Sequence, residues 1–250
     1  MNKFSGKLVF DGTYVSTKTY KDKIPLIWGF DYDSHDCPHF MLVPSENYVA
    51  CVKYFSDLRS IGYKMRYLVC DDNNAIKMAA EYVYPNCVIQ TCLKHYLENI
   101  RRFLNIRSSD KYLSFFLDVK NVIYDRRLCE PEVAFEIVKL YEIYKDDINE
   151  YNILTDIMYK RKELTNYHMF EDCPNTSNLI EGFNGHLKDR LKALRGFKSF
   201  HSARRWLNAY VLRRRTTKFK ACNKKFRHLN GKTPIESTLK SNEEIPNIFN

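Results

Sequence analysis

The chain has 250 residues, of which 44% are hydrophobic and 14% are aromatic. This composition supports a packed core and excludes an intrinsically disordered chain. No apolar run approaches the about 20 residues that a transmembrane helix needs, so no membrane partner is expected. The formal net charge is +10, which favours a polyanionic partner.

The start of the chain and its cysteines indicate a reducing compartment. Residues 1–6 lead directly into a predicted strand, so no signal peptide is expected. The eight cysteines are scattered without paired spacing. In a chain without an export signal, this pattern predicts reduced thiols in the cytosol.

The first half of the chain alternates strand and helix patterns. β-Favouring runs at 7–16, 25–32 and 40–43 are separated by polar turns, which predicts an antiparallel meander. A helix follows, with Ser45 as its N-cap and Gly62 just after its end. The next predicted elements are a strand over 65–70, a helix over 75–84, a strand over 87–90 and a helix over 93–104.

The second half of the chain is predicted to be almost entirely helical. Residues 110–162 keep a helical apolar period throughout, which is compatible with an all-helical block. Further helices are expected over 178–194 and 200–215, and a turn at 230–236 leads into a short final helix. No glycine-rich phosphate loop is present, so nothing supports a nucleotide-binding protein.

Three acidic residues occupy settings that are unusual for lone carboxylates. Asp11 lies inside the apolar run 8–15, Asp71 follows the apolar run 67–70, and Glu181 opens a basic amphipathic segment. A carboxylate in a buried strand is costly to desolvate and needs a counter-charge. A shared Mg²⁺ or Mn²⁺ would supply it, because these ions prefer carboxylate oxygens. Together the three residues predict a metal-dependent phosphoryl-transfer site.

Each acidic residue also has a purely structural alternative. Asp11 and the following glycine could form a turn between two short strands. One of the residues 71–74 could cap the next helix, and Asp72 is the one expected to do so. Asn178 and Glu181 fit a capping box, which for Glu181 alone would be the better interpretation. The combination of all three acids favours the metal site.

Positive charge is concentrated in one segment. Residues 187–227 contain 15 Lys and Arg against one acid, so the remainder of the chain carries a net charge of −4. Aromatic residues are interleaved with these cations, which is typical of a polyanion-binding surface; a solvated helix face is the alternative. The sequence places almost no acidic residues beside Arg213, Arg214 and Arg215, which disfavours that alternative. The cations expected to contact the polyanion are Lys188, Arg195, Arg204, Arg205, Arg213, Arg214, Arg215, Lys218 and Lys220.

The order of these elements, with Asp in the first strand, Asp after the fourth and Glu on a late helix, resembles the ribonuclease-H-like fold of DDE transposases. Within these it is most similar to the Mutator-like group and its prokaryotic insertion-sequence relatives. The residues that carry the resemblance are 8–14, Asp71, 75–76, 84–85, Gln90, Cys92, His95, 176–184, 195–197 and 231–236.

The resemblance implies an α/β fold: a five-stranded mixed sheet flanked by helices, with an all-helical insertion between the second Asp and the Glu. The implied divisions are a first part of the core over 1–108, the insertion over 109–170, the completion of the core with the Glu helix over 171–215, and a basic tail over 216–250.

The resemblance also implies that Asp11, Asp71 and Glu181 are catalytic and bind the metal, with Asn178 and Asn184 supporting them. Asp71 is preferred to Asp72 because it directly continues the strand. Cys92 and His95 match the Cys-x2-His marker of the group. No partner pair at zinc-ligand spacing follows them, so a structural or supporting role is favoured over half of a zinc site.

The implied activity is Mg²⁺-dependent cleavage and transfer of DNA strands, with Mn²⁺ able to substitute. The implied partners are element-end and target DNA and further copies of the chain. The implied location is the cytoplasm with the nucleoid, or the nucleus in a eukaryote. Members of this group usually carry an N-terminal DNA-binding region, whereas here the first strand begins by Lys7. An inactive or domesticated remnant that binds DNA, a plain nuclease of the same fold and an RNA-binding module stay open as alternatives.

Overall fold

The computed structural model describes residues 4–19, 21–170, 172–194 and 196–239. The chain divides into two compact units. We call the first the sheet unit; it contains residues up to Leu68, Asn73–Cys87 and the chain from Ser177 onward. We call the second the helical unit; it contains Val69–Asp72 and Val88–Thr176. No helix in the described part of the chain is long and apolar enough to span a membrane.

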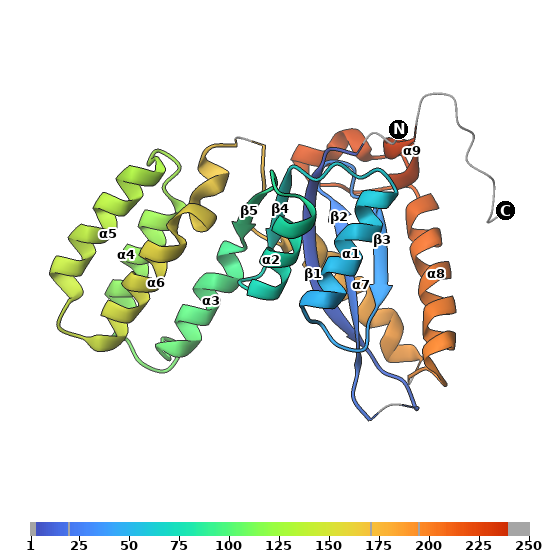
Figure 1. Cartoon of the computed structure of the whole chain (residues 1–250), viewed down its shortest axis with the longest axis horizontal. Helices are drawn as coiled ribbons and strands as arrows, with labels where there is room; N and C mark the ends of the chain where they lie inside the picture. Colours follow the sequence, from blue (N-terminus) through green and yellow to red (C-terminus); the bar gives the residue numbers. More distant parts are fainter. Residues whose placement is uncertain (1–3, 20, 171, 195, 240–250) are drawn as a thin grey trace. The chain divides into compact units, whose positions relative to one another are not determined.

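Five strands form one sheet in the order β3-β2-β1-β4-β5. They are β1 (Lys7–Val15), β2 (Ile24–Asp31), β3 (His39–Leu42), β4 (Tyr67–Cys70) and β5 (Val88–Thr91). The pairs β1–β2 and β2–β3 are antiparallel, which confirms the predicted meander. The expectation of an α/β protein with a five-stranded mixed sheet flanked by helices is thus confirmed (Figure 1).

The central strand β2 is buried on both of its faces. Every residue of β2 is buried, as its continuous apolar run predicts. Asp11 lies within β1 opposite Trp28 of β2, so the alternative of a turn at Asp11 is wrong. Because side chains alternate along a strand, Asp11 faces the same side as Val9 and the opposite side from Phe10.

Helices cover each face of this part of the sheet. Figure 1 shows α1 (Tyr48–Ser60) in front of the strands and α7 (Asn178–Ala193) behind them. Phe10 packs on the α1 side, with its ring centroid 4.9 Å from that of Tyr54. Val9 packs on the other side, in a core that also contains residues of α7 and of α8 (Phe200–Thr216). Asp11 therefore faces α7.

Two predicted N-caps in the first half of the chain are wrong by one or two residues. The cap of α1 is Asn47, whose side chain accepts a hydrogen bond from the Ala50 amide, and Ser45 instead accepts from the Asn47 side chain. The cap of α2 (Asn74–Val83) is Asn73, which accepts from the Ala75 amide. Asp72 therefore does not cap this helix.

The helical unit has its own apolar core. It is built by α3 (Leu93–Phe103), α4 (Leu113–Tyr124), α5 (Glu130–Tyr144) and α6 (Ile148–Thr165), followed by the 3₁₀ turn η1 (Asn166–His168). The helical apolar period of residues 110–162 is thereby confirmed. Helix α3 packs with this unit, so the division expected at residue 109 falls inside it, between α3 and α4.

The C-terminal segment folds onto the sheet unit as far as it is described. The 3₁₀ helix η2 (Lys224–Leu229) leads into α9 (Pro234–Thr238), which begins with a capping box between Thr233 and Glu236. The Oγ1 atom of Thr238 donates a hydrogen bond of 2.8 Å to Asp36. The expected short final helix is confirmed, whereas residues 240–250 of the expected basic tail lie outside the described part of the chain.

Candidate active site

Asp11 is held by two N–H donors within the sheet unit. The Gly12 amide donates to its Oδ1 atom over 2.7 Å, and the side-chain amide of Asn184 on α7 donates to its Oδ2 atom over 2.8 Å. The indole N–H of Trp28 in turn donates to the Asn184 Oδ1 atom over 2.9 Å. Because an indole can only donate, it fixes the amide with its NH₂ group toward Asp11. Trp28 thus orients the amide group that donates to the Asp11 carboxylate.

Glu181 lies near the start of α7. It precedes Asn184 by three residues, so both side chains lie on one face of the helix. The Oε1 atom of Glu181 is shielded from solvent. Helix α7 packs against β1, and it thereby carries Glu181 toward the strand that carries Asp11.

The predicted capping box around Glu181 is wrong. The N-cap residue of α7 is Ser177, and Asn178 is the first residue of the helix. Glu181 is consequently the fourth helical residue, whereas a capping box requires the third. The interpretation of Glu181 as a member of a capping box is therefore excluded by the position of the helix start.

Asp71 lies in the helical unit beside the two residues of the family marker. Ligand atoms of Asp71, Cys92 and His95 lie within 4.8 Å of one another. The Nδ1 atom of His95 is hydrogen bonded to Asp71 Oδ1. This bond, and a second one to Cys92, raises the pKa of His95 to about 10, so the imidazole is a cation at neutral pH. Cys92 is completely buried at the start of α3, and its amide donates to the Cys70 carbonyl at the end of β4.

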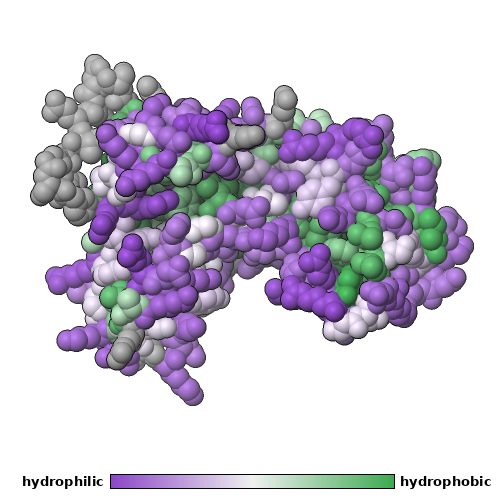
Figure 2. Space-filling model, turned by 180° about the vertical axis from the view of Figure 1, so that it is seen from behind, coloured by the Kyte–Doolittle hydropathy of each residue, from purple (hydrophilic) through white to green (hydrophobic). Residues whose placement is uncertain are grey.

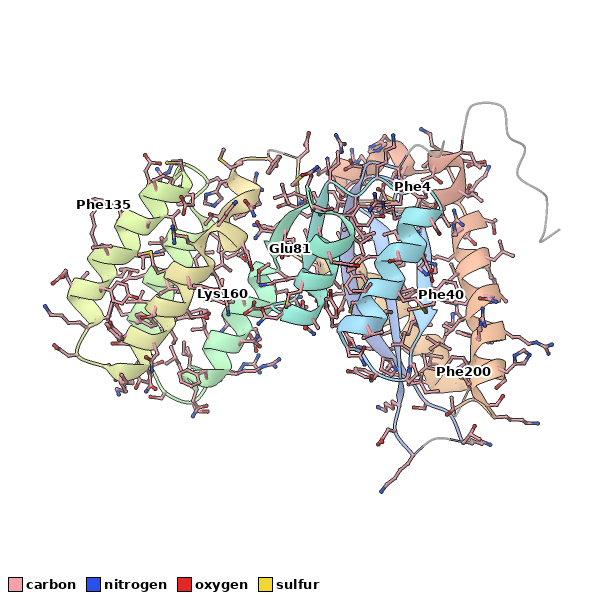
Figure 3. The ribbon with its side chains drawn as sticks, viewed as in Figure 1. Phe4, Phe40, Glu81, Phe135, Lys160 and Phe200 are labelled. Carbon is pink, nitrogen blue, oxygen red and sulfur yellow. The ribbon has the colours of Figure 1, made fainter. Side chains whose placement is uncertain are left out.

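Asp72 has a different partner from its neighbour. The Nζ atom of Lys160, labelled on α6 in Figure 3, lies 2.6 Å from Asp72 Oδ2 and 2.8 Å from Asp156 Oδ1. The predicted role of Asp72 as a helix cap is wrong, because Asn73 takes that role. Its carboxylate instead joins β4 to α6 through an ion pair.

Most of the cations expected to bind a polyanion are exposed in the sheet unit. Hydrophilic side chains project from this unit on the left of Figure 2. Exposed members of the predicted set are Lys188, Arg204, Arg205, Arg213, Lys218 and Lys220. Arg195 lies outside the described residues.

Two of the predicted arginines have structural contacts instead. Arg215 forms a forked pair with Asp36, with N–O distances of 2.7 and 2.8 Å, and Asp36 is 0% exposed. The expectation that Arg213, Arg214 and Arg215 lack acidic partners is therefore wrong for Arg215. Arg214 lies 4.4 Å from the ring centroid of Phe183, and burial lowers the pKa of its guanidinium.

The comparison with protein families decides the class of the protein. The family model described as "Transposase, Mutator family" matches residues 29–222. The chain belongs to the Mutator family of transposases. The matched segment of this Mutator-family chain contains Asp71, Cys92, His95 and Glu181, while Asp11 precedes it. A comparison with curated proteins gave no match.

The carboxylate donors of this Mutator-family chain fit a hard metal ion. The carboxylates of Asp11, Asp71 and Glu181 offer only oxygen, which suits hard ions such as Mg²⁺ and Mn²⁺. Cys92 and a neutral His95 would offer sulfur and nitrogen to a softer ion such as Zn²⁺, but the proton that His95 holds opposes this. Asp71 contacts His95, so its carboxylate is oriented by a cation on the same unit. Dedicated partners thus orient Asp11 and Asp71 within their own units.

Proposed function

We propose that this Mutator-family protein is a DDE transposase with a ribonuclease-H-like fold, in which residues between Asp71 and Glu181 form an all-helical insertion. The observation that carries the proposal is the hydrogen bond from Asn184 to Asp11. It links the helix that bears Glu181 to the strand that bears Asp11. The sequence predicts that the carboxylates of both elements bind the metal. The alternation of strands and helices and the three successive helices α4–α6 support the same proposal.

Asp11, Asp71 and Glu181 would hold Mg²⁺, with Mn²⁺ able to substitute. Such ions stabilise charge on a phosphate and lower the pKa of bound water. Within the protein, Asn184 keeps one carboxylate oxygen of Asp11 directed to α7, and His95 keeps Asp71 in one orientation.

The substrate would be DNA at the ends of a mobile element and at its target. The exposed cations of α7, α8 and the following segment would neutralise phosphates, which positions a duplex without reading its bases. Several copies of the chain would act together, because two element ends must be joined to one target. The protein would be located with the DNA of the cell.

A nicking and joining assay tests this function. Supercoiled plasmid is incubated with the protein, Mg²⁺ or Mn²⁺, and a labelled duplex with a free 3′-OH. We expect nicked circles and labelled plasmid from the wild-type protein, and neither product from Asp71→Asn or Glu181→Gln. Asp72→Asn is the matched control and should keep both products, because Lys160 retains Asp156 as a partner.

Each of the remaining results would point to a different protein. Nicked circles without labelled plasmid would identify a plain nuclease. Equal nicking by wild type and Asp71→Asn would contradict the triad. Binding of the plasmid without any cleavage under either metal would contradict an active enzyme and indicate a DNA-binding remnant.

A further inference from the structure

A groove on the helical unit gathers positive charge outside the segment to which the sequence assigned DNA binding. It lies between α3 and α4 and has a volume of about 420 Å³. Its basic lining residues are Lys94, His95, Arg101, Arg102, Arg107 and Lys120. We propose that this groove binds the phosphate backbone of a DNA strand next to Asp71. The proposal rests on the function proposed above and adds a second DNA contact to it.

The arginines of the groove carry more positive charge than its acid balances. Among the described residues that line it, Glu98 is the one acid. Three guanidinium groups share this carboxylate: Arg101 at 3.2 Å, Arg102 at 3.4 Å and Arg107 at 2.8 Å. One carboxylate balances one of these charges, so an excess of positive charge is left on the three arginines. Cations gathered in a concave surface attract and concentrate a polyanion.

The geometry of the arginines suits phosphate groups. The side chains of Arg102 and Arg107 are 72% and 74% exposed, so their donors are accessible beside Glu98. Arg101 lies 5.1 Å from the ring centroid of Phe116 on α4, which fixes its planar group in the groove wall. A guanidinium presents two parallel N–H donors that match two phosphate oxygens. These residues can therefore contact successive phosphates of one strand.

The groove leads to the candidate metal ligand of its own unit. His95 lines one end and is hydrogen bonded to Asp71, while Arg102 lies seven residues further along α3. At 1.5 Å per residue, these positions are about 10 Å apart along the helix axis. That length corresponds to about three nucleotides at about 3.4 Å each. A strand lying in the groove would thus extend up to the Asp71 carboxylate.

Nucleic acid is the polyanion that the lining favours. Tyr124 lies on α4 in the groove wall and is 36% exposed, which gives a base a face on which to stack. The chain also belongs to a family of DNA-processing proteins. Contacts of this kind are made to phosphates, so the groove would bind all sequences about equally.

Two double variants with equal charge change test the groove. Arg102→Ala with Lys120→Ala removes two exposed cations from its two walls and leaves Glu98 paired with Arg101 and Arg107. Lys139→Ala with Lys145→Ala removes two exposed cations from α5 and its C-cap in the same unit, each paired with one glutamate. The thermal unfolding midpoint of both proteins should match that of the wild type, since all four side chains are exposed.

The readout is the binding of a fluorescent DNA by anisotropy between 50 and 200 mM salt. We expect the groove variant to lower the slope of log affinity against log salt by about two units on a duplex, at about 0.9 per phosphate contact. The α5 variant should keep the wild-type slope, and Arg102→Lys with Lys120→Arg should restore it. The same slope in the groove variant and the wild type would overturn the inference, as would an equal fall in the α5 variant.

Failure of this inference is distinguishable from failure of the proposed function. If the wild-type protein nicks and joins DNA but the groove variant keeps the full salt slope, only the groove is wrong. If the wild-type protein binds DNA and the groove variant flattens the slope, but no cleavage occurs with either metal, the groove stands as a DNA site and the enzymatic function is wrong.

Discussion

Trp28 donates its indole N–H to the side-chain carbonyl of Asn184 over 2.9 Å, although 156 residues separate the two in the sequence. This bond orients the side-chain amide of Asn184, so that its NH₂ group donates to the Asp11 carboxylate over 2.8 Å. Trp28 is 1% exposed, so water does not replace this bond if it is lost. A buried tryptophan therefore fixes the position of a candidate metal ligand.

Loss of either residue should weaken metal binding. Asn184→Ala removes the donor to Asp11 and should lower Mn²⁺ affinity about 10–100-fold, as for other partners of metal ligands. Trp28→Phe should act in the same direction and destabilise the fold by about 1–3 kcal/mol, because it leaves the buried Asn184 carbonyl without its donor. Mn²⁺ titration and urea unfolding measure the two effects. Trp206→Phe is the control, because Trp206 stacks on Tyr210 at 5.2 Å and is not part of the hydrogen-bond chain from Trp28 to Asp11. An equal loss in this control would contradict the relay.

The neighbours Asp71 and Asp72 should have different roles, in catalysis and in stability respectively. Asp72→Ala breaks the ion pair with Lys160, and the double-mutant cycle with Lys160→Ala should give a coupling energy of about 0.5–3 kcal/mol in urea unfolding. Cleavage of DNA should persist in Asp72→Ala and be lost in Asp71→Ala. Loss of cleavage in Asp72→Ala with activity in Asp71→Ala would show that Asp72, and not Asp71, is the metal ligand.

Arg213 and Arg215 should differ although they lie on the same helix. Arg215→Ala leaves Asp36 buried without its forked partner, and such a change costs about 3–5 kcal/mol of unfolding free energy. Arg213→Ala removes an exposed cation and should change stability by less than about 0.5 kcal/mol. It should instead lower the salt slope of DNA binding by about one unit. Urea unfolding and a salt titration of both variants check this, and equal destabilisation would contradict it.

His35 should make stability fall in mild acid. Its ring lies among the rings of Phe183, Phe219 and Phe226, and burial, followed by the charge of Arg214, lowers the pKa of His35 to about 4 from 6.5. The unfolded chain therefore takes up the proton first as the pH falls. The contribution of neutral His35 to the free energy of unfolding is complete above pH 6.5. It declines toward pH 4, by about 3 kcal/mol in total.

The variant His35→Asn isolates this effect. Asparagine tolerates the positive φ of 54° at this position and does not titrate. Asp33 and His228 also act on His35, with opposite signs, and both are kept in the variant. Unfolding free energies at pH 7 and pH 4.5 should therefore differ less in the variant than in the wild type. An unchanged pH dependence would contradict the buried, neutral state of His35.

The strands and helices could be predicted because their apolar periods are local. The N-caps were missed where several good capping residues adjoin, as at Asp72 and Asn73 or at Ser177 and Asn178. The choice between such neighbours is made by distant residues: Lys160 engages Asp72, which leaves Asn73 to cap. Local sequence contains no record of that contact.

The candidate site was predictable only in part for the same reason. Carboxylates in apolar strands can be seen in the sequence, because their burial needs a counter-charge. The partners Trp28 and Asp36 could not be seen, because the first acts across 156 residues and the second pairs across 179. One signal was present: Trp28 lies in a fully buried strand, where a donor-only indole needs an acceptor.

A titration with Mn²⁺, followed by its electron paramagnetic resonance signal, tests the shared metal site most directly. It requires no knowledge of the element ends and does not depend on catalysis. We predict that Asp11→Asn, Asp71→Asn and Glu181→Gln each weaken Mn²⁺ binding, while Asp72→Asn binds like the wild-type protein. Unchanged Mn²⁺ binding in Asp11→Asn or Glu181→Gln, beside a loss in Asp71→Asn, would show that the three carboxylates do not share a metal site.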